Sequence, residues 1–294
     1  MNSDGFLIVD KSPGMTSHDV VAIARRALGT RKVGHAGTLD PMATGVLVLG
    51  FGNGTRLLQY ITEGEKTYRA TIVLGASTVT DDMEGEILSV ATAAEMVAIS
   101  DGDITRELHA MRGVISQRPS SVSAVKVNGE RAYARVRAGE DVKLAPREVR
   151  ISQLDILSIE KIENKIEVEI EVTCSAGTFI RAIARDCGDA LAVGGHLSSL
   201  RRTRVASFSQ KETFSVEQLK SGDFLPLSIE KVAEFIFPLR HISPAEKLEL
   251  SFGRSLTLNQ SDEIVAALAE GTLVALLSNR DEKAHPIAVF AAKN

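Results

Sequence analysis

Alternating apolar and polar residues predict one long β-strand at residues 166–174. Apolar side chains would lie on one face of it, at Ile166, Val168, Ile170, Val172 and Cys174. Polar side chains would lie on the other, at Glu167, Glu169, Glu171 and Thr173. Because one face is then solvated, the pattern favours an antiparallel or mixed sheet over a parallel sheet buried on both faces.

The same reasoning predicts further strands on both sides of this one. Residues 66–74 alternate, while 6–9 and 46–49 are short apolar runs next to turn residues. Shorter candidate strands follow at 123–127, 273–277 and 286–290.

Helical spacing of apolar residues predicts a helix with Ser17 as its N-cap and Gly29 as its end. Its apolar face would hold Val20, Val21, Ala24 and Leu28. Further helices are expected near residues 55–60, 93–100, 104–114, 131–138, 179–191 and 244–250. Strands and helices in this order indicate an α+β fold.

A domain boundary is predicted at Phe237–Pro238, which divides the chain into residues 1–236 and 237–294. The second part is about the minimum size of an independent domain. We therefore expect a large domain followed by a small one.

The composition is that of a soluble globular protein, with 44% hydrophobic and 24% charged residues. No stretch approaches the ~20 apolar residues of a membrane helix, and the N-terminus lacks the pattern of a secretory signal. The only cysteines are Cys174 and Cys187, which excludes a disulfide scaffold and a multi-cysteine zinc site. We expect a cytoplasmic protein that does not contact membranes.

The net charge of −4 and the pI near 5.9 argue against a general nucleic-acid binder. The charge is unevenly distributed, however, because residues 160–171 are mainly acidic and arginines cluster elsewhere. Those clusters are Arg131, Arg135 and Arg137, and Arg201, Arg202 and Arg204. They form either a local basic surface for a compact RNA or ordinary solvated faces, and composition leaves both interpretations open.

The glycine-rich segment 34–45 contains the clearest candidate for chemistry. Its glycines allow the backbone to approach a ligand closely, and Pro41 biases Asp40 toward an extended conformation. His35 adds a flat polar ring. The segment is either a site that holds a carboxylate against a sugar or base, or a surface turn built from common turn residues.

A second candidate is Arg181 at the start of a predicted helix. Its apolar neighbours favour a guanidinium that seeks a carboxylate or phosphate, although an exposed helix arginine fits the spacing equally well. Tyr68 by default is a half-buried aromatic residue of a strand.

Three other patterns are weak. Residues 50–55 follow a strand like a dinucleotide fingerprint, but Thr55 stands where its last glycine is required. Asp81, Asp82 and Glu84 lack the spacing of a calcium loop, so a charged turn is favoured. The histidines form no HxxxH pair. We expect no metal and no cofactor.

Ordered motifs over about residues 5–210 resemble the TruB family of tRNA pseudouridine synthases. They are Asp10-Lys11, Gly14-Met15-Thr16-Ser17-His18-Asp19, Gly34-His35-Ala36-Gly37-Thr38-Leu39-Asp40-Pro41, Lys66-Thr67-Tyr68-Arg69-Ala70, Leu74-Gly75, Ser123-Ala124-Val125-Lys126-Val127-Asn128-Gly129, Cys174-Ser175-Ala176-Gly177-Thr178-Phe179-Ile180-Arg181, His196-Leu197 and Leu200-Arg201-Arg202-Thr203. The chain departs from the family pattern at Ser12, Ser120, Val122 and Phe179, where proline or tyrosine is more usual.

The resemblance implies a mixed, largely antiparallel central sheet of the pseudouridine synthase type with flanking helices. It also implies a small PUA-like domain at 237–294 that contacts RNA. The expected activity is cofactor-independent isomerisation of one uridine in the T-loop of tRNA to pseudouridine.

By resemblance, Asp40 acts when the glycosidic bond breaks, Arg181 keeps it ionised, and Tyr68 stacks on the base and relays the C5 proton. Attack by Asp40 on the anomeric carbon, attack on uracil C6 and removal of a sugar proton all remain open. Base extrusion costs a few kcal/mol, and His35 is expected to fill the vacated space. Other substrate-binding residues expected are Phe179, Leu200, Lys11, Arg201 and Arg202, the last three as phosphate contacts.

A different hypothesis is an RNA-binding or tRNA-folding module that keeps the fold without turnover. A nucleotide-dependent dehydrogenase rests on residues 50–55 and has little support. The expected partner is the tRNA T-stem-loop, and a monomer is the default oligomeric state.

Overall fold

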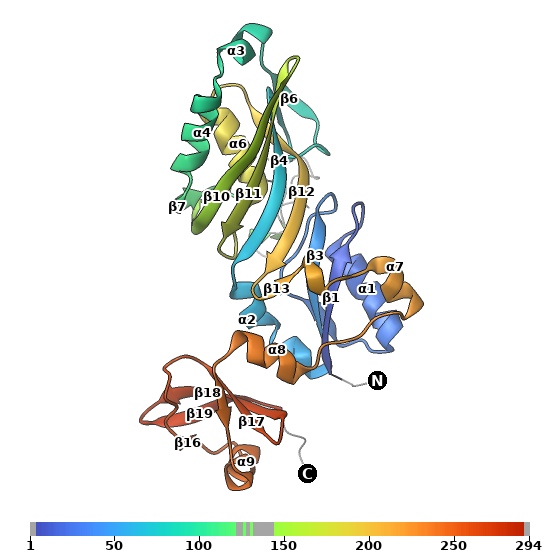
Figure 1. Ribbon diagram of the computed structural model, residues 1–294, viewed down its shortest axis with the longest axis vertical. Helices are drawn as coiled ribbons and strands as arrows, with labels where there is room; N and C mark the ends of the chain where they lie inside the picture. Colours follow the sequence, from blue (N-terminus) through green and yellow to red (C-terminus); the bar gives the residue numbers. More distant parts are fainter. Residues whose placement is uncertain (1–3, 122–125, 128–129, 132–143, 291–294) are drawn as a thin grey trace. The chain divides into compact units, whose positions relative to one another are not determined.

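The computed structural model describes residues 4–121, 126–127, 130–131 and 144–290 (Figure 1). Two compact units share the chain. The first comprises Met1–Asp40, Val46–Thr62 and Ala206–Asn294, and the second comprises Pro41–Gly45 and Glu63–Val205.

The second unit is built on antiparallel strands in the order β12-β4-β11-β10-β7. These are β4 (Lys66–Leu74), β7 (Gly113–Gln117), β10 (Arg147–Ile162), β11 (Lys165–Cys174) and β12 (Gly195–Val205). Helix α6 (Ile180–Ala190) packs against β4 and β12 and against α4 (Asp101–Ala110) (Figure 1). Smaller elements are β5 (Ala76–Thr78), β6 (Ile87–Val90), α3 (Ala93–Ala98), β8 (Lys126–Val127) and β9 (Glu130–Arg131).

Strand β11 confirms the alternation predicted from the sequence. Its apolar side chains from Ile166 to Cys174 are buried, and its glutamates are partly or fully exposed. Thr173 is the exception on the polar face, because it is buried and its hydroxyl lies 3.0 Å from that of Thr67 on β4.

The first unit holds the other strands of the sheet. These are β1 (Gly5–Lys11), β2 (Val33–His35), β3 (Thr44–Phe51), β13 (Phe208–Ser209) and β14 (Phe214–Ser215). The first residues of β3, Thr44 and Gly45, belong to the second unit and pair in parallel with Arg201 and Arg202 of β12. The hydrogen-bonded order β14-β1-β3-β12-β4-β11-β10-β7, with β2 and β13 beside it, makes a ten-stranded mixed sheet. The predicted fold class, mixed and largely antiparallel with flanking helices, is confirmed.

Helices and short turns complete this part of the first unit. They are α1 (Ser17–Leu28), the 3₁₀ turns η1 (Gly52–Arg56) and η2 (Gln210–Glu212), α2 (Leu58–Glu63), α7 (Val216–Ser221) and α8 (Ile229–Ile236). Among the helices of the described residues, none is long and apolar enough to cross a membrane.

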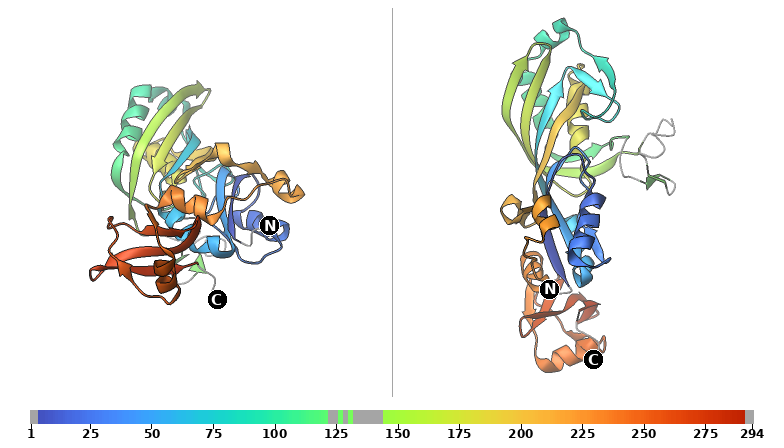
Figure 2. Two further views of the ribbon diagram at one scale, coloured as in Figure 1. Left: turned by 60° about the horizontal axis from the view of Figure 1, so that its bottom comes forward. Right: turned by 90° about the vertical axis from the view of Figure 1, so that its right-hand side faces the viewer.

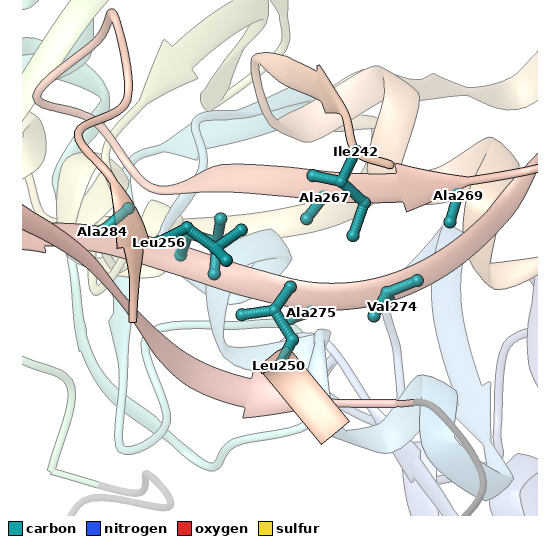
Figure 3. Close-up of a cluster of buried hydrophobic side chains, with 9 residues drawn as sticks. Ile242, Leu250, Leu256, Ala267, Ala269, Val274, Ala275 and Ala284 are labelled. Carbon is teal, nitrogen blue, oxygen red and sulfur yellow. The ribbon is translucent and has the colours of Figure 1, made fainter. Parts of the chain in front are cut away.

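The C-terminal residues form a separate five-stranded sheet in the order β15-β17-β18-β19-β16 (Figure 2). Its elements are β15 (Leu239–His241), α9 (Pro244–Ser251), β16 (Leu256–Thr257), β17 (Val265–Ala269), β18 (Thr272–Arg280) and β19 (Lys283–Val289). Leu250 projects from α9 into an apolar cluster with Ile242, Leu256 and Val274 (Figure 3). This small sheet therefore has its own core, and the domain boundary at residue 237 stays a prediction.

Several predicted element boundaries need correction. The N-cap of α1 is Thr16, whose side chain accepts from the Asp19 amide, so Ser17 is the first helical residue. The helix expected at 104–114 ends at Ala110, because Gly113 takes a positive φ of 93° and opens β7. Arg131 lies in β9 instead of opening a helix. The remaining residues of the predicted segments 123–125 and 132–138 lie outside the described residues.

Lys66, the first residue of β4, gives a testable pH dependence. Its side chain is buried and its ammonium donates to the carbonyl of Gly64 at 2.6 Å. Burial, and secondarily the charge of Arg202, lower the pKa of Lys66 from 10.5 to about 8. The unfolded chain keeps the Lys66 proton between about pH 8 and 10.5, where the folded chain has lost it, so Lys66 makes the free energy of unfolding rise with pH. Above about pH 9 the buried thiols of Cys174 and Cys187 oppose this rise, because burial raises their pKa from 9.0 to about 11 and about 12.

We expect Lys66→Met to remove this rise, measured by urea unfolding at several pH values from 7.5 to 9, below the range in which the two thiols oppose it. The matched control is Lys211→Met, which removes an exposed lysine and should keep the rise. An equal rise in wild type and in both variants would contradict the assignment.

Candidate active site

The loop that carries Asp40 is held by buried neighbours. Strand β2 ends at His35, and the amide of Ala36 then donates to the carbonyl of Val48 at 2.9 Å. Ala36 and Leu39 are buried, whereas Asp40 is half-buried. Gly37 lies between these anchors with φ of 94°, a conformation that favours glycine. The backbone before Asp40 is therefore held in place by buried residues, while the Asp40 side chain stays partly exposed.

The hydroxyl of Ser17 binds this loop from α1. It accepts from the amide of Leu39 at 2.8 Å and donates to the carbonyl of the same residue at 3.2 Å. Ser17 is fully buried. The residue before Asp40 is thus tied to α1 through both of its backbone polar groups.

His35 is half-buried and lies beside a second imidazole. The ring of His18 meets it edge to face, with 5.5 Å between centroids and an interplanar angle of 82°. This contact restrains the plane of His35. Its proposed role in filling the space of the flipped base stays a prediction.

Tyr68 and Leu200 are brought together by the register of two strands. Tyr68 of β4 lies opposite Arg202 of β12, and Ala70 lies opposite Leu200. Directly opposite residues of an antiparallel pair share a face of the sheet. Tyr68 and Leu200 are 8% and 7% exposed, so this face carries a buried aromatic and a buried aliphatic side chain at diagonal positions of the two strands, and their role in binding the base stays a prediction.

The expected phosphate contacts differ in exposure. Lys11 is fully buried, and its ammonium donates to the carbonyls of Ser12 and Met15 at 3.0 and 2.6 Å. Arg202 is also buried, while Arg201 is half-buried and donates to the Thr44 hydroxyl at 3.3 Å. The ammonium of Lys11 thus holds the turn that follows β1, and the phosphate contacts expected of Lys11, Arg201 and Arg202 stay predictions.

Gly45 shows why the segment after the loop requires glycine. It has φ of 99°, and a methyl group at its Cα would lie 2.1 Å from the carbonyl oxygen of Arg202. The close parallel pairing of β3 with β12 at this point therefore depends on the absence of a side chain.

Arg181 stands in the first turn of α6 and is 4% exposed. Its Nη1 donates to Oδ2 of Asp82 at 3.1 Å and to the carbonyl of Thr80 at 2.7 Å. The other oxygen of Asp82 accepts from the Thr80 hydroxyl and the Glu84 amide. The sequence predicted that the Arg181 guanidinium binds a carboxylate or phosphate, and the carboxylate of Asp82 binds it in this structure. The proposed pairing of Arg181 with Asp40 stays a prediction.

Phe179, the residue before α6, is fixed by a buried amide. Gln117 at the end of β7 accepts from the Phe179 amide at 2.8 Å and donates to its carbonyl at 3.0 Å. The guanidinium of Arg147 lies 4.6 Å from the centroid of the Phe179 ring. The half-buried ring is therefore restrained at its backbone and on one face.

Sequence reasoning missed three buried polar contacts of the candidate segments: Ser17 with Leu39, Asp82 with Arg181, and Gln117 with Phe179. Asp82 looked like part of a charged turn, and an arginine among apolar residues was the signal that a buried acid must exist. Because Thr16 already caps α1, the hydroxyl of Ser17 needs another partner, and this was the signal for its contact with Leu39. No sequence pattern near Gln117 indicates that its side chain binds the backbone of Phe179. Among the described residues, no group of three His, Cys, Asp or Glu side chains is arranged to hold a metal ion.

Comparisons with known proteins identify the family of the chain. The family model described as TruB family pseudouridylate synthase (N terminal domain) matches residues 25–180. Two C-terminal models match as well, tRNA pseudouridylate synthase B C-terminal domain at 181–247 and tRNA Pseudouridine synthase II, C terminal at 237–291.

Relatives match along nearly the whole chain. A protein of Arthrobacter sp. (strain FB24) named tRNA pseudouridine synthase B is 51% identical, over 99% of this chain and 97% of its own. One of the same name from Nocardia farcinica (strain IFM 10152) is 47% identical, over 97% and 92%.

A solved structure of an H/ACA RNP bound to a substrate RNA containing 2′-deoxyuridine has the same fold. Its TM-score is 0.71 at 23% identity, over 99% of this chain and 86% of that one. The family models and the relatives, which match along nearly the whole chain, show that the chain belongs to the TruB family of pseudouridylate synthases.

Proposed function

We propose that this protein isomerises one uridine in the T-loop of tRNA to pseudouridine, with Asp40 as the catalytic carboxylate. The observation that carries the proposal is the half-buried Asp40 on an anchored loop, in a chain 51% identical to a protein named tRNA pseudouridine synthase B. The T-stem-loop is the proposed binding partner. We also propose a monomer that works in the cytoplasm, where free cysteines such as Cys174 and Cys187 stay reduced.

The reaction needs a carboxylate and no change of oxidation state. The N1–C1′ bond breaks, the uracil turns, C5 bonds to C1′ and loses its proton, and N1 gains a proton, so that the product is an isomer of uridine. Positive character develops at the anomeric carbon, and a carboxylate stabilises it or attacks it, as in retaining glycosidases. Attack of Asp40 on uracil C6 and removal of a sugar proton are the other routes by which it would act.

Tyr68 and Leu200 are proposed to receive the uracil after it leaves the RNA stack. They lie on one face of the sheet through the β4–β12 register, and both are nearly buried. An aromatic ring stacks on a base with little regard to its identity. The Tyr68 hydroxyl is proposed to accept or relay the C5 proton.

Arg181 is proposed to keep Asp40 ionised in the closed site. Closure removes water and would raise the pKa of a carboxyl group, whereas a nearby cation opposes that change. A guanidinium carries five N–H donors, and Asp82 receives one from Nη1. Asp82 would thus orient a cation that serves a second carboxylate.

RNA recognition is proposed to involve the loop and the small C-terminal domain. His35, restrained by His18, would occupy the space of the extruded uridine. Residues 237–294, which include the separate five-stranded sheet, would act as a PUA-like RNA-contact domain. The splayed nucleotides of a folded T-loop are read individually, and the rest of the RNA by its shape.

Asp40→Asn tests the central residue. The protein is incubated with an unmodified T-stem-loop RNA that carries tritium at uridine C5, without cofactor. We expect wild type to release tritium and Asp40→Asn to release none while its Kd for the RNA stays within about twofold, because the amide lacks the charge that the reaction uses.

Asp223→Asn, at an exposed aspartate, is the matched control and should react like wild type. Turnover by Asp40→Asn at a rate close to that of wild type would refute the role of Asp40. RNA binding by wild type without any release would favour a binding or folding module instead.

Arg181→Lys tests whether the guanidinium of Arg181 is needed to keep Asp40 ionised. An ammonium cannot reproduce the planar fork of donors that Asp82 and a second acceptor require. We expect the single-turnover rate to fall by about 100-fold or more. Arg254→Lys, which changes an exposed arginine paired with Glu249, should leave the rate unchanged. A rate for Arg181→Lys within twofold of wild type would contradict the proposed charge pairing.

A further inference from the structure

We propose that Ser17 is a positioning residue that sets the place of the Asp40 carboxylate. This inference rests on the proposed function. The Ser17 hydroxyl accepts from the Leu39 amide at 2.8 Å and donates to the Leu39 carbonyl at 3.2 Å. That carbonyl belongs to the peptide group that joins Leu39 to Asp40. One hydroxyl therefore holds the plane of the peptide from which Asp40 begins.

The helix does not need Ser17 for its own capping. Thr16 is the N-cap, and its hydroxyl accepts from the Asp19 amide at 3.1 Å. The Asp19 carboxylate in turn accepts from the Thr16 amide and hydroxyl at 2.8 and 2.7 Å. This capping box is complete without Ser17, whose hydroxyl is directed to a residue 22 positions later in the chain.

The surroundings strengthen both hydrogen bonds of Ser17. Its side chain is 0% exposed and that of Leu39 is 3% exposed, so water does not compete for these groups. Loss of the hydroxyl would leave a buried amide and a buried carbonyl without this partner, and the loop would shift to recover them.

Asp40 is particularly sensitive to such a shift. Gly37 stands three residues before it with φ of 94°, and glycine gives the backbone more freedom than any other residue. The proline that follows Asp40 restrains its ψ. Ser17 restrains the peptide group before Asp40 through hydrogen bonds, and Pro41 restrains the backbone after it by steric contact. A displacement of about 1 Å at a reacting group lowers a rate by up to ~100-fold.

The test compares Ser17→Ala with Thr16→Ala. Both variants remove one hydroxyl at the start of α1, but only Ser17→Ala removes the bonds to Leu39. The measurements are the single-turnover rate of tritium release, the Kd for the T-stem-loop RNA and the Tm. We expect Ser17→Ala to lose about 10- to 100-fold in rate with Kd within twofold. Thr16→Ala should keep its rate within twofold although its Tm falls by a few degrees.

A rate for Ser17→Ala within twofold of wild type overturns the proposal, as does an equal rate loss in Thr16→Ala. Hydrogen exchange of wild type gives a result even where a variant does not fold: the Leu39 amide should exchange slowly, and exchange as fast as in an exposed loop overturns the proposal. Failure of the proposed function is distinguishable, because wild type would then release no tritium at all.

Discussion

The antiparallel pairing of β4 with β12 is the constraint on which the site in the second unit depends. It sets Tyr68 opposite Arg202 and Ala70 opposite Leu200, and a slip by one residue would turn each of these side chains to the other face. The far side of β4 pairs with β11 along its full length, from Lys66 opposite Cys174 to Leu74 opposite Ile166. A central strand with two long partners cannot shift, and this keeps an aromatic and an aliphatic side chain in one place.

Buried polar side chains hold the segments that carry the candidate site residues. Ser17 binds both backbone groups of Leu39, Gln117 binds both backbone groups of Phe179, and Asp82 binds Arg181. Buried polar groups are favourable only when their hydrogen bonds are made, so each of these residues both satisfies itself and fixes its target. Glycines such as Gly37 and Gly45 supply unusual backbone conformations, and the polar contacts then remove the freedom that glycine brings.

Local sequence patterns were sufficient to predict the strands at 66–74 and 166–174, because the alternation of apolar and polar residues is visible among residues adjacent in the sequence. They did not predict β10 or β12. For the arginines at 201, 202 and 204 in β12 the sequence left open a local basic surface for RNA and an ordinary solvated face, whereas Arg202 is buried and Arg204 donates to the Thr67 hydroxyl. Tertiary contacts override such local signals.

The candidate site, too, was predictable from the sequence only in part. Motif resemblance identified Asp40, Tyr68 and Arg181, but the residues that support the site are distant in sequence from their targets. The separations are 22 residues for Ser17 and Leu39, 62 for Gln117 and Phe179, and 99 for Asp82 and Arg181. No periodicity or motif connects such pairs, since only the folded chain brings them together.

A crystal structure of the protein with a T-stem-loop RNA tests the account most directly. The target uridine would carry fluorine at C5, which cannot leave as a proton does, so the reaction would stop with the nucleotide in place. We expect the uridine outside the RNA stack, its uracil on Tyr68, and an oxygen of Asp40 within about 3.5 Å of the reacting nucleotide. A uridine still stacked in the RNA, with the Asp40 carboxylate facing bulk solvent, would contradict the account.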